Sequence, residues 1–257
     1  MLTITTWNVN SIKIRLPQVL AWLEANKPDI LALQELKQDT HLVDKQAFEA
    51  LGYQTAIAGQ PTYNGVAILS RHPIQEVSVN LPTFDDPQQR VLTAGILGLN
   101  IVNVYVPNGQ AVGSEKYAYK LAWLEGLREY LQQLKQKQAP VVVLGDFNIA
   151  PADNDVYDPK AWDGQVLVSE AEREAWRAIL ALGLVDSYRE LDKDNPMFTW
   201  WDYRNMAFRR NFGLRIDHVL VSDSLAPQCK SVSVDKDARK AERPSDHAPV
   251  SLSLDWP

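Results

Sequence analysis

The stretch VVVLGDFN, residues 141–148, is the clearest strand signal in this chain. Its first four residues are apolar without alternation, which is typical of a strand covered on both faces. Gly145 lets the backbone leave such a strand abruptly, and Asp146 and Asn148 follow at once. The stretch therefore predicts a central strand that delivers a carboxylate and an amide at its end. A plain turn is the alternative interpretation, because Gly, Asp and Asn all favour turns.

Other apolar runs alternate along the chain with segments of helical periodicity. Strands are expected over residues 2–7, 30–33, 66–69, 101–106, 216–221 and 250–254. Helices are expected over 16–23 with Pro17 near the start, over 121–134, and after a capping box at 169–172. This mixed order predicts an α/β sandwich rather than a strict βαβ series, in one domain spanning residues 1–257.

The overall composition restricts the setting in which the protein works. Cys229 is the single cysteine, so an internal disulfide is impossible and a cytoplasmic, reducing compartment is expected. The start of the chain lacks the basic region of a signal peptide, and no apolar run approaches the ~20 residues that span a bilayer. The net charge of −6 argues weakly against a nucleic-acid partner, but a local basic surface matters more than the total.

Six polar residues stand at the ends of predicted strands. Four of them follow a strand and two precede one: Asn8, Glu35, Tyr105 and Asp146, then Asp217 and His247. If the last two strands run antiparallel to the others, all six side chains meet at one rim of the sheets. Loops at such a rim commonly carry the chemistry of an enzyme.

Glu35 is the first candidate for a metal ligand. Mg²⁺ takes hard oxygen ligands and often uses only one or two protein carboxylates together with oxygens of the substrate. Taken alone, Glu35 fits better with a solvated acid at the end of a strand, because glutamates prefer the surface.

His247 is the candidate imidazole of the site, and Asp217 is its expected carboxylate partner. A carboxylate fixes the tautomer of a histidine and keeps the ring basic. A buried structural histidine is the alternative. The other histidines are expected on the surface or, for the last, in strand packing: His41, His72 and His218.

The segment from Thr199 to Arg215 carries four arginines and five aromatic residues within 17 positions. Such interleaving suits contacts with phosphates combined with stacking or wedging against bases. An aromatic loop packed on the core with solvated arginines is the alternative. Residues 11–15 form a second, weaker basic loop, and Tyr105 and Asn108 could both reach phosphate oxygens.

In this order, the segments resemble the exonuclease III family of Mg²⁺-dependent abasic-site endonucleases, within the endonuclease/exonuclease/phosphatase superfamily. The resemblance runs from Thr6–Asn10 to Ser245–His247 and so covers nearly the whole chain. Each motif is short, but their joint order is specific. The resemblance implies a DNase I-like fold, a four-layer sandwich in which helices flank two packed mixed β-sheets.

The resemblance also implies a role for each matching residue. Its metal ligands would be Glu35, with Asn8, Asp246, Asp146 and Asn148 around it. Its catalytic residues would be Asp146, His247, Asp217, Tyr105 and Asn148. Its substrate-binding residues would be Asn108, Trp200, Leu214, Ile216, Arg204, Arg209, Arg210, Lys13 and Arg15. Asn10 stands where some relatives carry aspartate, which argues against a full second metal site.

The implied activity is hydrolysis of the phosphodiester 5′ to an abasic site in double-stranded DNA. It would need Mg²⁺, with Mn²⁺ as a substitute, and 3′-phosphodiesterase and 3′→5′ exonuclease action would accompany it, in a monomer. Asp146 or His247 would serve as the base. One alternative is mainly 3′-end processing with weak abasic cleavage, favoured if the bulk of Leu167 obstructs the pocket. Others are a phosphatase of small phosphoesters and a non-catalytic nucleic-acid-binding module.

Overall fold

The protein is described here by a computed structural model that covers residues 1–137 and 139–257. One sheet contains β1 (Leu2–Asn8), β2 (Ile30–Gln34), β3 (Gln54–Ala58), β4 (Val66–Ser70), β11 (Cys229–Val234) and β12 (Val250–Leu254). The other contains β5 (Gln75–Val79), β6 (Val91–Ile96), β7 (Leu99–Tyr105), β8 (Val141–Asp146), β9 (Leu184–Asp186) and β10 (Asp217–Ser222). The strand orders are β11-β12-β1-β2-β4-β3 and β5-β6-β7-β8-β10-β9.

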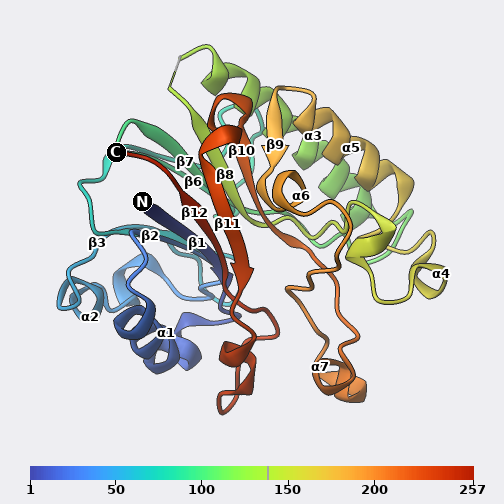
Figure 1. Ribbon diagram of the computed structural model, residues 1–257, viewed down its shortest axis with the longest axis horizontal. Coiled ribbons are helices and arrows are strands. Elements are labelled where there is room, and N and C mark those ends of the chain that lie inside the picture. The colour runs from blue at the N-terminus through green and yellow to red at the C-terminus, as the bar shows by residue number, and fades with distance from the viewer. Residues whose placement is uncertain (138) are drawn as a thin grey trace.

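Helices cover the outer faces of both sheets, as Figure 1 shows. The α-helices are α1 (Ile12–Asn26), α2 (Lys45–Glu49), α3 (Glu115–Lys135), α4 (Pro159–Trp162), α5 (Glu170–Leu180), α6 (Ser187–Leu191) and α7 (Ala207–Arg210). Side chains of α1 and α2 pack on the first sheet, and side chains of α3 and α5 pack on the second. The predicted four-layer α/β sandwich is confirmed. No α-helix in the described ranges is long and apolar enough to cross a membrane.

Strand β8 lies at the centre of the second sheet, and it explains why residues 141–144 are apolar without alternation. Val142 and Leu144 point into the core between the two sheets, whereas Val141 and Val143 point into the core beneath α3 and α5. All four are buried. Full burial of each such side chain stabilises the fold by roughly 1.5–3 kcal/mol. The strand covered on both faces is therefore confirmed.

The strand directions bring the predicted site together. β1 runs parallel to β2, and β7 runs parallel to β8. β12 runs antiparallel to β1, and β10 runs antiparallel to β8. The ends of the first four strands and the starts of the last two therefore lie at the same rim, as expected from the sequence.

The start of α1 differs from the prediction. The helix begins at Ile12, so Pro17 is its sixth residue rather than one near its start, and residues 12–15 are helical rather than a basic loop. The preceding turn is fastened to the β2 end, because Ser11 N donates to Glu35 O at 2.8 Å and Ile12 N donates to Leu36 O at 3.0 Å. These tertiary hydrogen bonds let the helix begin one and a half turns before the proline. The capping box at Ser169 and Glu172 is present.

Candidate active site

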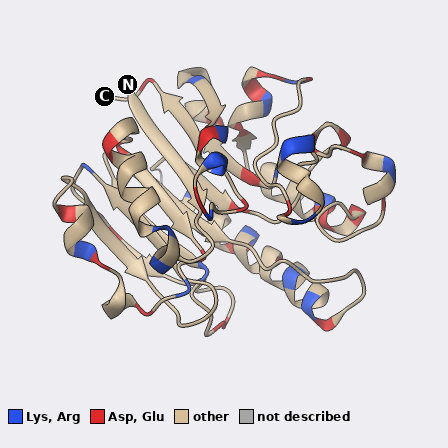
Figure 2. Cartoon of the chain, turned by 90° about the horizontal axis from the view of Figure 1, so that it is seen from below, with Lys and Arg blue, Asp and Glu red and all other residues tan. Residues whose placement is uncertain are grey.

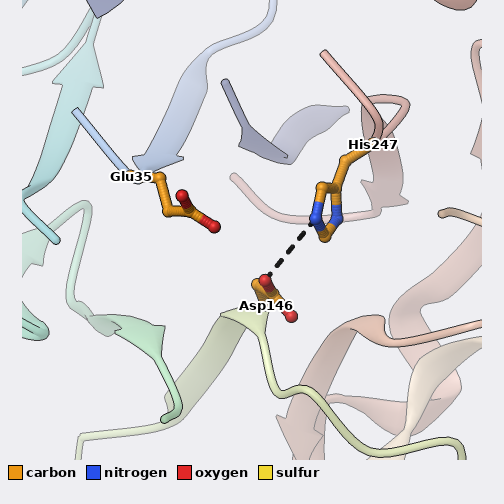
Figure 3. A group of neighbouring side chains, drawn as sticks. All are labelled: Glu35, Asp146 and His247. Carbon is orange, nitrogen blue, oxygen red and sulfur yellow. Dashed lines mark ion pairs between the residues drawn. The ribbon is translucent and has the colours of Figure 1, made fainter. Parts of the chain in front are cut away.

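Glu35, Asp146 and His247 form the centre of the site. Each offers one ligand atom, and these atoms all lie within 4.8 Å of one another. Figure 3 shows the three side chains converging from separate segments, with Glu35 after β2, Asp146 at the end of β8 and His247 before β12. Both sheets thus contribute, and the site exists only when the sandwich is assembled.

Asn8 holds the two carboxylates in place. Its Nδ2 donates to Glu35 Oε1 and to Asp146 Oδ2, both at 2.9 Å. Its Oδ1 accepts from the backbone N–H of Asn10 at 2.9 Å. In this arrangement Asn8 presents donors to the carboxylates and orients them.

A second ring of polar groups surrounds Glu35. Lys37 Nζ lies 2.9 Å from Glu35 Oε2 and donates to Asn10 Oδ1 at 2.6 Å. Asp246 accepts from Asn10 Nδ2 at 3.0 Å and from Trp200 Nε1 at 2.9 Å. Burial alone would raise the pKa of Asp246, but the charge of His247 and these two donors lower it overall. Asp246 is therefore a half-buried anion beside the three central residues.

The donors fit a divalent metal ion. The central group combines carboxylate oxygens from Glu35 and Asp146 with one imidazole and no thiolate. Hard divalent cations such as Mg²⁺ and Mn²⁺ prefer oxygen ligands and can leave coordination positions for water and substrate. Such an ion would be held mainly by Glu35, with Asp146 and Asp246 adding negative charge nearby.

His247 is held by Asp217 from behind. Its Nδ1 lies 2.9 Å from Asp217 Oδ2, and Asp217 also accepts from Thr199 Oγ1 at 2.7 Å. Burial would lower the pKa of His247, but the carboxylates of Asp217 and Asp146 outweigh it and raise the pKa to about 10. The ring is therefore an imidazolium at neutral pH, with Nε2 facing the site 3.7 Å from Asp146 Oδ2.

Asp146 is the carboxylate whose proton affinity is most unusual. It is 1% exposed. Burial raises its pKa most strongly; the charge of His247 opposes this, the charge of Asp217 adds to it, and the pKa becomes about 7. A group with a pKa near the working pH is suited to accept a proton in a reaction. Asn148 N donates to Asp146 Oδ1 at 2.9 Å and fixes its direction.

Tyr105, Asn108 and Asn148 lie along the same rim. Burial and the negative charges of Glu35 and Asp146 hold the pKa of Tyr105 well above its usual value, so its hydroxyl remains a donor. Asn148 Oδ1 accepts from Asn108 Nδ2 at 3.2 Å, and Asn148 Nδ2 donates to Val106 O at 3.0 Å. The amides are therefore linked to each other before any ligand arrives.

The residues expected to form an apolar pocket lie together in one packed cluster next to Asp246. Trp200, Leu214 and Ile216 pack with Val156 and Leu167 in one cluster. Leu167 is 5% exposed and has a φ of 79°, a left-handed conformation that costs a leucine energy. Its bulk therefore lies among the residues of this cluster.

The basic residues divide into two groups. Lys13, Arg204, Arg209 and Arg210 are exposed. In Figure 1, α7, which carries Arg209 and Arg210, projects from the lower edge of the molecule, and the view from below in Figure 2 shows charges of both signs. Arg15 is instead buried, and its guanidinium donates to Asn10 O, Tyr203 Oη and Pro244 O. Arg15 thus fastens three loops together and does not extend into solvent.

Three residues near the site were not identified from the sequence. Thr199 holds Asp217, Lys37 contacts Glu35, and the buried Lys120 donates to the backbone of Asn108 and Asn148. Lys37 had a local signal, since it lies two positions after Glu35. The others contact the site only through tertiary packing.

Comparison with known proteins places the chain among nucleases. Residues 5–247 match the sequence profile of the Endonuclease/Exonuclease/phosphatase family. Exodeoxyribonuclease III of Haemophilus influenzae is 35% identical over 258 residues, covering 95% of this chain and 97% of the relative. The 3′ phosphatase NExo from Neisseria, solved with a product DNA hairpin, has a TM-score of 0.98 and 47% identity over 100% of both chains. An AP endonuclease from Archaeoglobus fulgidus has a TM-score of 0.96 and 39% identity, covering 99% of this chain and 100% of that chain.

These matches define the class as metal-dependent hydrolases of phosphoesters built on two packed sheets. The chain belongs to the endonuclease/exonuclease/phosphatase family and, within it, to the exonuclease III nucleases.

Proposed function

We propose that the protein is a Mg²⁺-dependent DNA repair nuclease that hydrolyses the phosphodiester 5′ to an abasic site and also processes blocked 3′ ends. One observation carries the proposal: Asp246 joins the charged rim around Glu35 to the apolar cluster through its hydrogen bond with Trp200 Nε1. The proposed phosphate-cleaving group and the apolar cluster that we propose accepts a bare sugar are therefore adjacent. Its relatives named exodeoxyribonuclease III and AP endonuclease support the same assignment.

The proposed reaction is a one-step, in-line displacement at phosphorus. The oxygen of the attacking water bonds to phosphorus while Asp146 accepts one proton from that water. At the same time the bond from phosphorus to the 3′ oxygen breaks. The imidazolium of His247 stabilises the charge that gathers on the phosphate oxygens, and the amide of Asn148 adds a hydrogen bond. A bound divalent cation would supply further charge stabilisation for these oxygens and for the departing 3′ oxygen.

Asp146 is favoured over His247 as the base. His247 Nδ1 is paired with Asp217, so the ring keeps its proton and can act as a fixed cation. Asp146 has a pKa near 7 and an oxygen 3.7 Å from His247 Nε2. A phosphate group held by His247, together with its attacking water, would therefore lie close to the Asp146 oxygen that accepts the proton.

The balance between abasic cleavage and 3′-end processing is assigned to the pocket. An abasic sugar has no base to unpair, so flipping it out of the helix costs less than flipping an intact nucleotide. A pocket of Trp200, Leu214 and Ile216 suits a bare deoxyribose. The bulk of Leu167 would hinder a sugar within a continuous strand more than one at a 3′ end, so mainly 3′-end processing is the second candidate.

The deciding experiment compares two duplexes under single-turnover conditions, one with an internal abasic site and one with a 3′-blocked nick. Wild type and Leu167→Gly are measured with Mg²⁺, with Val77→Thr on the distant edge strand β5 as control. The proposal expects strong abasic cleavage by wild type. Cleavage of 3′ ends alone, with abasic cleavage gained in Leu167→Gly, would replace the main assignment with the second candidate.

The setting follows from the proposed substrate. We expect one domain over residues 1–257 that acts as a monomer on double-stranded DNA in the bacterial cytoplasm, at the nucleoid. A small phosphoester as substrate is disfavoured, because the exposed arginines of α7 suit an extended polyanion. Failure to cleave either duplex, together with release of phosphate from a small phosphoester, would reverse this preference.

A further inference from the structure

A buried ion pair lies beneath the loops of the proposed site. Lys120 on α3 and Glu172 on α5 are both 0% exposed, and Lys120 Nζ contacts Glu172 Oε1. Neither side chain belongs to the rim that would contact DNA. Two opposite charges buried in this way often stabilise a fold no better than apolar residues of similar size. Stability alone therefore does not explain why this ion pair is buried here.

The lysine binds two of the site loops by their backbones. Lys120 Nζ donates to Asn148 O at 2.6 Å and to Asn108 O at 3.1 Å. These are the two residues whose side-chain amides meet at 3.2 Å and are assigned to the phosphate. One ammonium group therefore sets the distance between the loop after β7 and the loop after β8.

The glutamate binds a third loop. Glu172 Oε1 accepts from Leu167 N at 3.0 Å, while Oε2 accepts from Ser169 N at 3.1 Å and Ser169 Oγ at 2.6 Å. Leu167 O in turn accepts from Ala150 N at 2.7 Å. The same carboxylate that neutralises Lys120 thus fixes the left-handed turn of Leu167 at the pocket.

We propose that Lys120 and Glu172 are positioning residues that hold the phosphate-binding amides and the sugar pocket in one fixed geometry. The inference rests on the proposed function for what the loops bind, but the bracing is a property of the free protein. The pair would act through Asn108, Asn148 and Leu167 and would not touch the substrate. Loss of the pair should loosen all three loops together.

The test replaces the pair with apolar residues, in Lys120→Met/Glu172→Leu, which avoids leaving one buried charge without its partner. The matched control is Arg128→Gln/Glu125→Gln, which removes an exposed ion pair from the same helix, α3. Hydrogen exchange is measured without DNA or metal on peptides covering 106–110, 147–150 and 166–169. Tm, DNA affinity and single-turnover rates on both duplexes complete the set.

We expect faster exchange in all three peptides of the double variant and no change in the control. The cleavage rate should fall about 10²-fold, the scale of a small misplacement of binding groups, while the Kd for DNA changes less than about threefold. A pair that only stabilises the fold would lower Tm and leave the rate at 25 °C near wild type. That result, or unchanged exchange in the three peptides, would overturn the proposal.

Two further outcomes are covered. If the double variant does not fold, Lys120→Met/Glu172→Gln carries the same test, because it leaves no unpaired buried charge and keeps an acceptor for Leu167 N but removes the ammonium that binds Asn108 O and Asn148 O. Unchanged exchange in peptides 106–110 and 147–150, with an unchanged rate, would then refute the bracing role. If wild type cleaves neither duplex, the proposed function fails, and the exchange measurement alone decides whether the pair braces the loops.

Discussion

Two histidines 29 residues apart in the chain are both buried, but one is charged at neutral pH and the other is neutral. His247 is 4% exposed and His218 is 1% exposed. His247 faces Asp217 and Asp146, and its pKa is raised to about 10. His218 faces the guanidinium of Arg215; burial and that cation lower its pKa to about 4. Burial disfavours the charge in both cases, so the neighbouring charges decide which histidine is an imidazolium.

The surroundings of the two rings differ in the same way. The His218 region is closed, since Arg215 Nε binds Asp155 at 2.6 Å, Arg215 Nη1 lies 2.8 Å from Asp186, and His218 Nε2 lies 2.9 Å from Ile149 O. The His247 region gathers Asp146, Glu35 and Asp246 around one imidazolium. The excess of negative charge around His247 is suited to binding a cation. The charges around His218 neutralise one another, as buried charges in a core must.

The largest effect should come from removing metal. We expect chelation with EDTA to abolish cleavage and Mg²⁺ or Mn²⁺ to restore it, because of the two regions the His247 region is the one with more carboxylates than cations. Added Mg²⁺ should also raise the Tm of wild type but not of Glu35→Gln, by preferential binding to the folded state. Full cleavage after thorough chelation would contradict the contrast between the two regions.

The next effect separates the regions by mutation. Asp146→Asn and His247→Asn should each lower kcat by about 10² or more, since they remove the proton acceptor or the fixed cation. Asp217→Asn should cost less, because it acts through His247. His218→Gln is the matched control, and its kcat should stay within about threefold of wild type. Single-turnover assays on abasic duplex measure all four, and a near wild-type rate for Asp146→Asn would refute the mechanism.

The third prediction concerns stability against pH. Because the pKa of His218 falls to about 4, the unfolded chain takes up its proton near pH 6.5 while the native protein does not. Stability should therefore drop as pH falls from 6.5 to 4, by about 3 kcal/mol in total. His218→Gln should remove this part of the loss. For His247 the sign is opposite: its contribution is complete below pH 6.5 and is lost as pH rises toward 10.

Urea unfolding of the metal-free protein across pH 4–8 measures this difference. The m-value must remain constant for the comparison between wild type and His218→Gln to report stability alone. If the free energy of unfolding falls equally with decreasing pH in wild type and His218→Gln, His218 is protonated in the native state. The contrast between the two histidines would then fail.

The sequence predicted the parts of this arrangement that depend on strand ends. Asp146 and Glu35 follow continuous apolar runs, and such runs identify buried strands whatever the partners are. The antiparallel entry of β10 and β12 then brings Asp217 and His247 to the same rim. The contact between the His247 ring and the Asp217 carboxylate followed from one assumption, namely that these two strands run antiparallel to the others.

Other features required tertiary information. Pro17 was expected at a helix start, yet the hydrogen bonds of Ser11 and Ile12 to the β2 end begin α1 earlier. This error also made Arg15 a loop residue, whereas it is a buried link between loops. Lys120 occupies an ordinary position in a helical pattern, and only the packing of α3 against α5 brings it to Glu172.

The smallest effect concerns the electrostatic attraction of DNA. It compares the arginine beside His218 with the arginines of α7. Arg215 is buried among carboxylates, whereas Arg209 and Arg210 on α7 are exposed. DNA affinity should fall with salt despite the net charge of −6, since binding releases counterions wherever a local cation meets a phosphate. Arg209→Ala and Arg210→Ala should each flatten the slope of log K against log salt by up to about one unit.

Arg210 should contribute less to this slope than Arg209, because its guanidinium already lies 4.1 Å from the centre of the Phe212 ring. The control is Arg177→Ala on α5, an exposed arginine that is paired with Glu170 and lies outside the rim. Fluorescence anisotropy with abasic duplex, measured with Ca²⁺ in place of Mg²⁺ at several salt concentrations, gives the slopes. If the double variant Arg209→Ala/Arg210→Ala binds with the wild-type slope, α7 does not contact phosphates. The substrate phosphate would then be attracted to the carboxylate-rich site around His247 only by the bound metal ion, as expected for a small phosphoester.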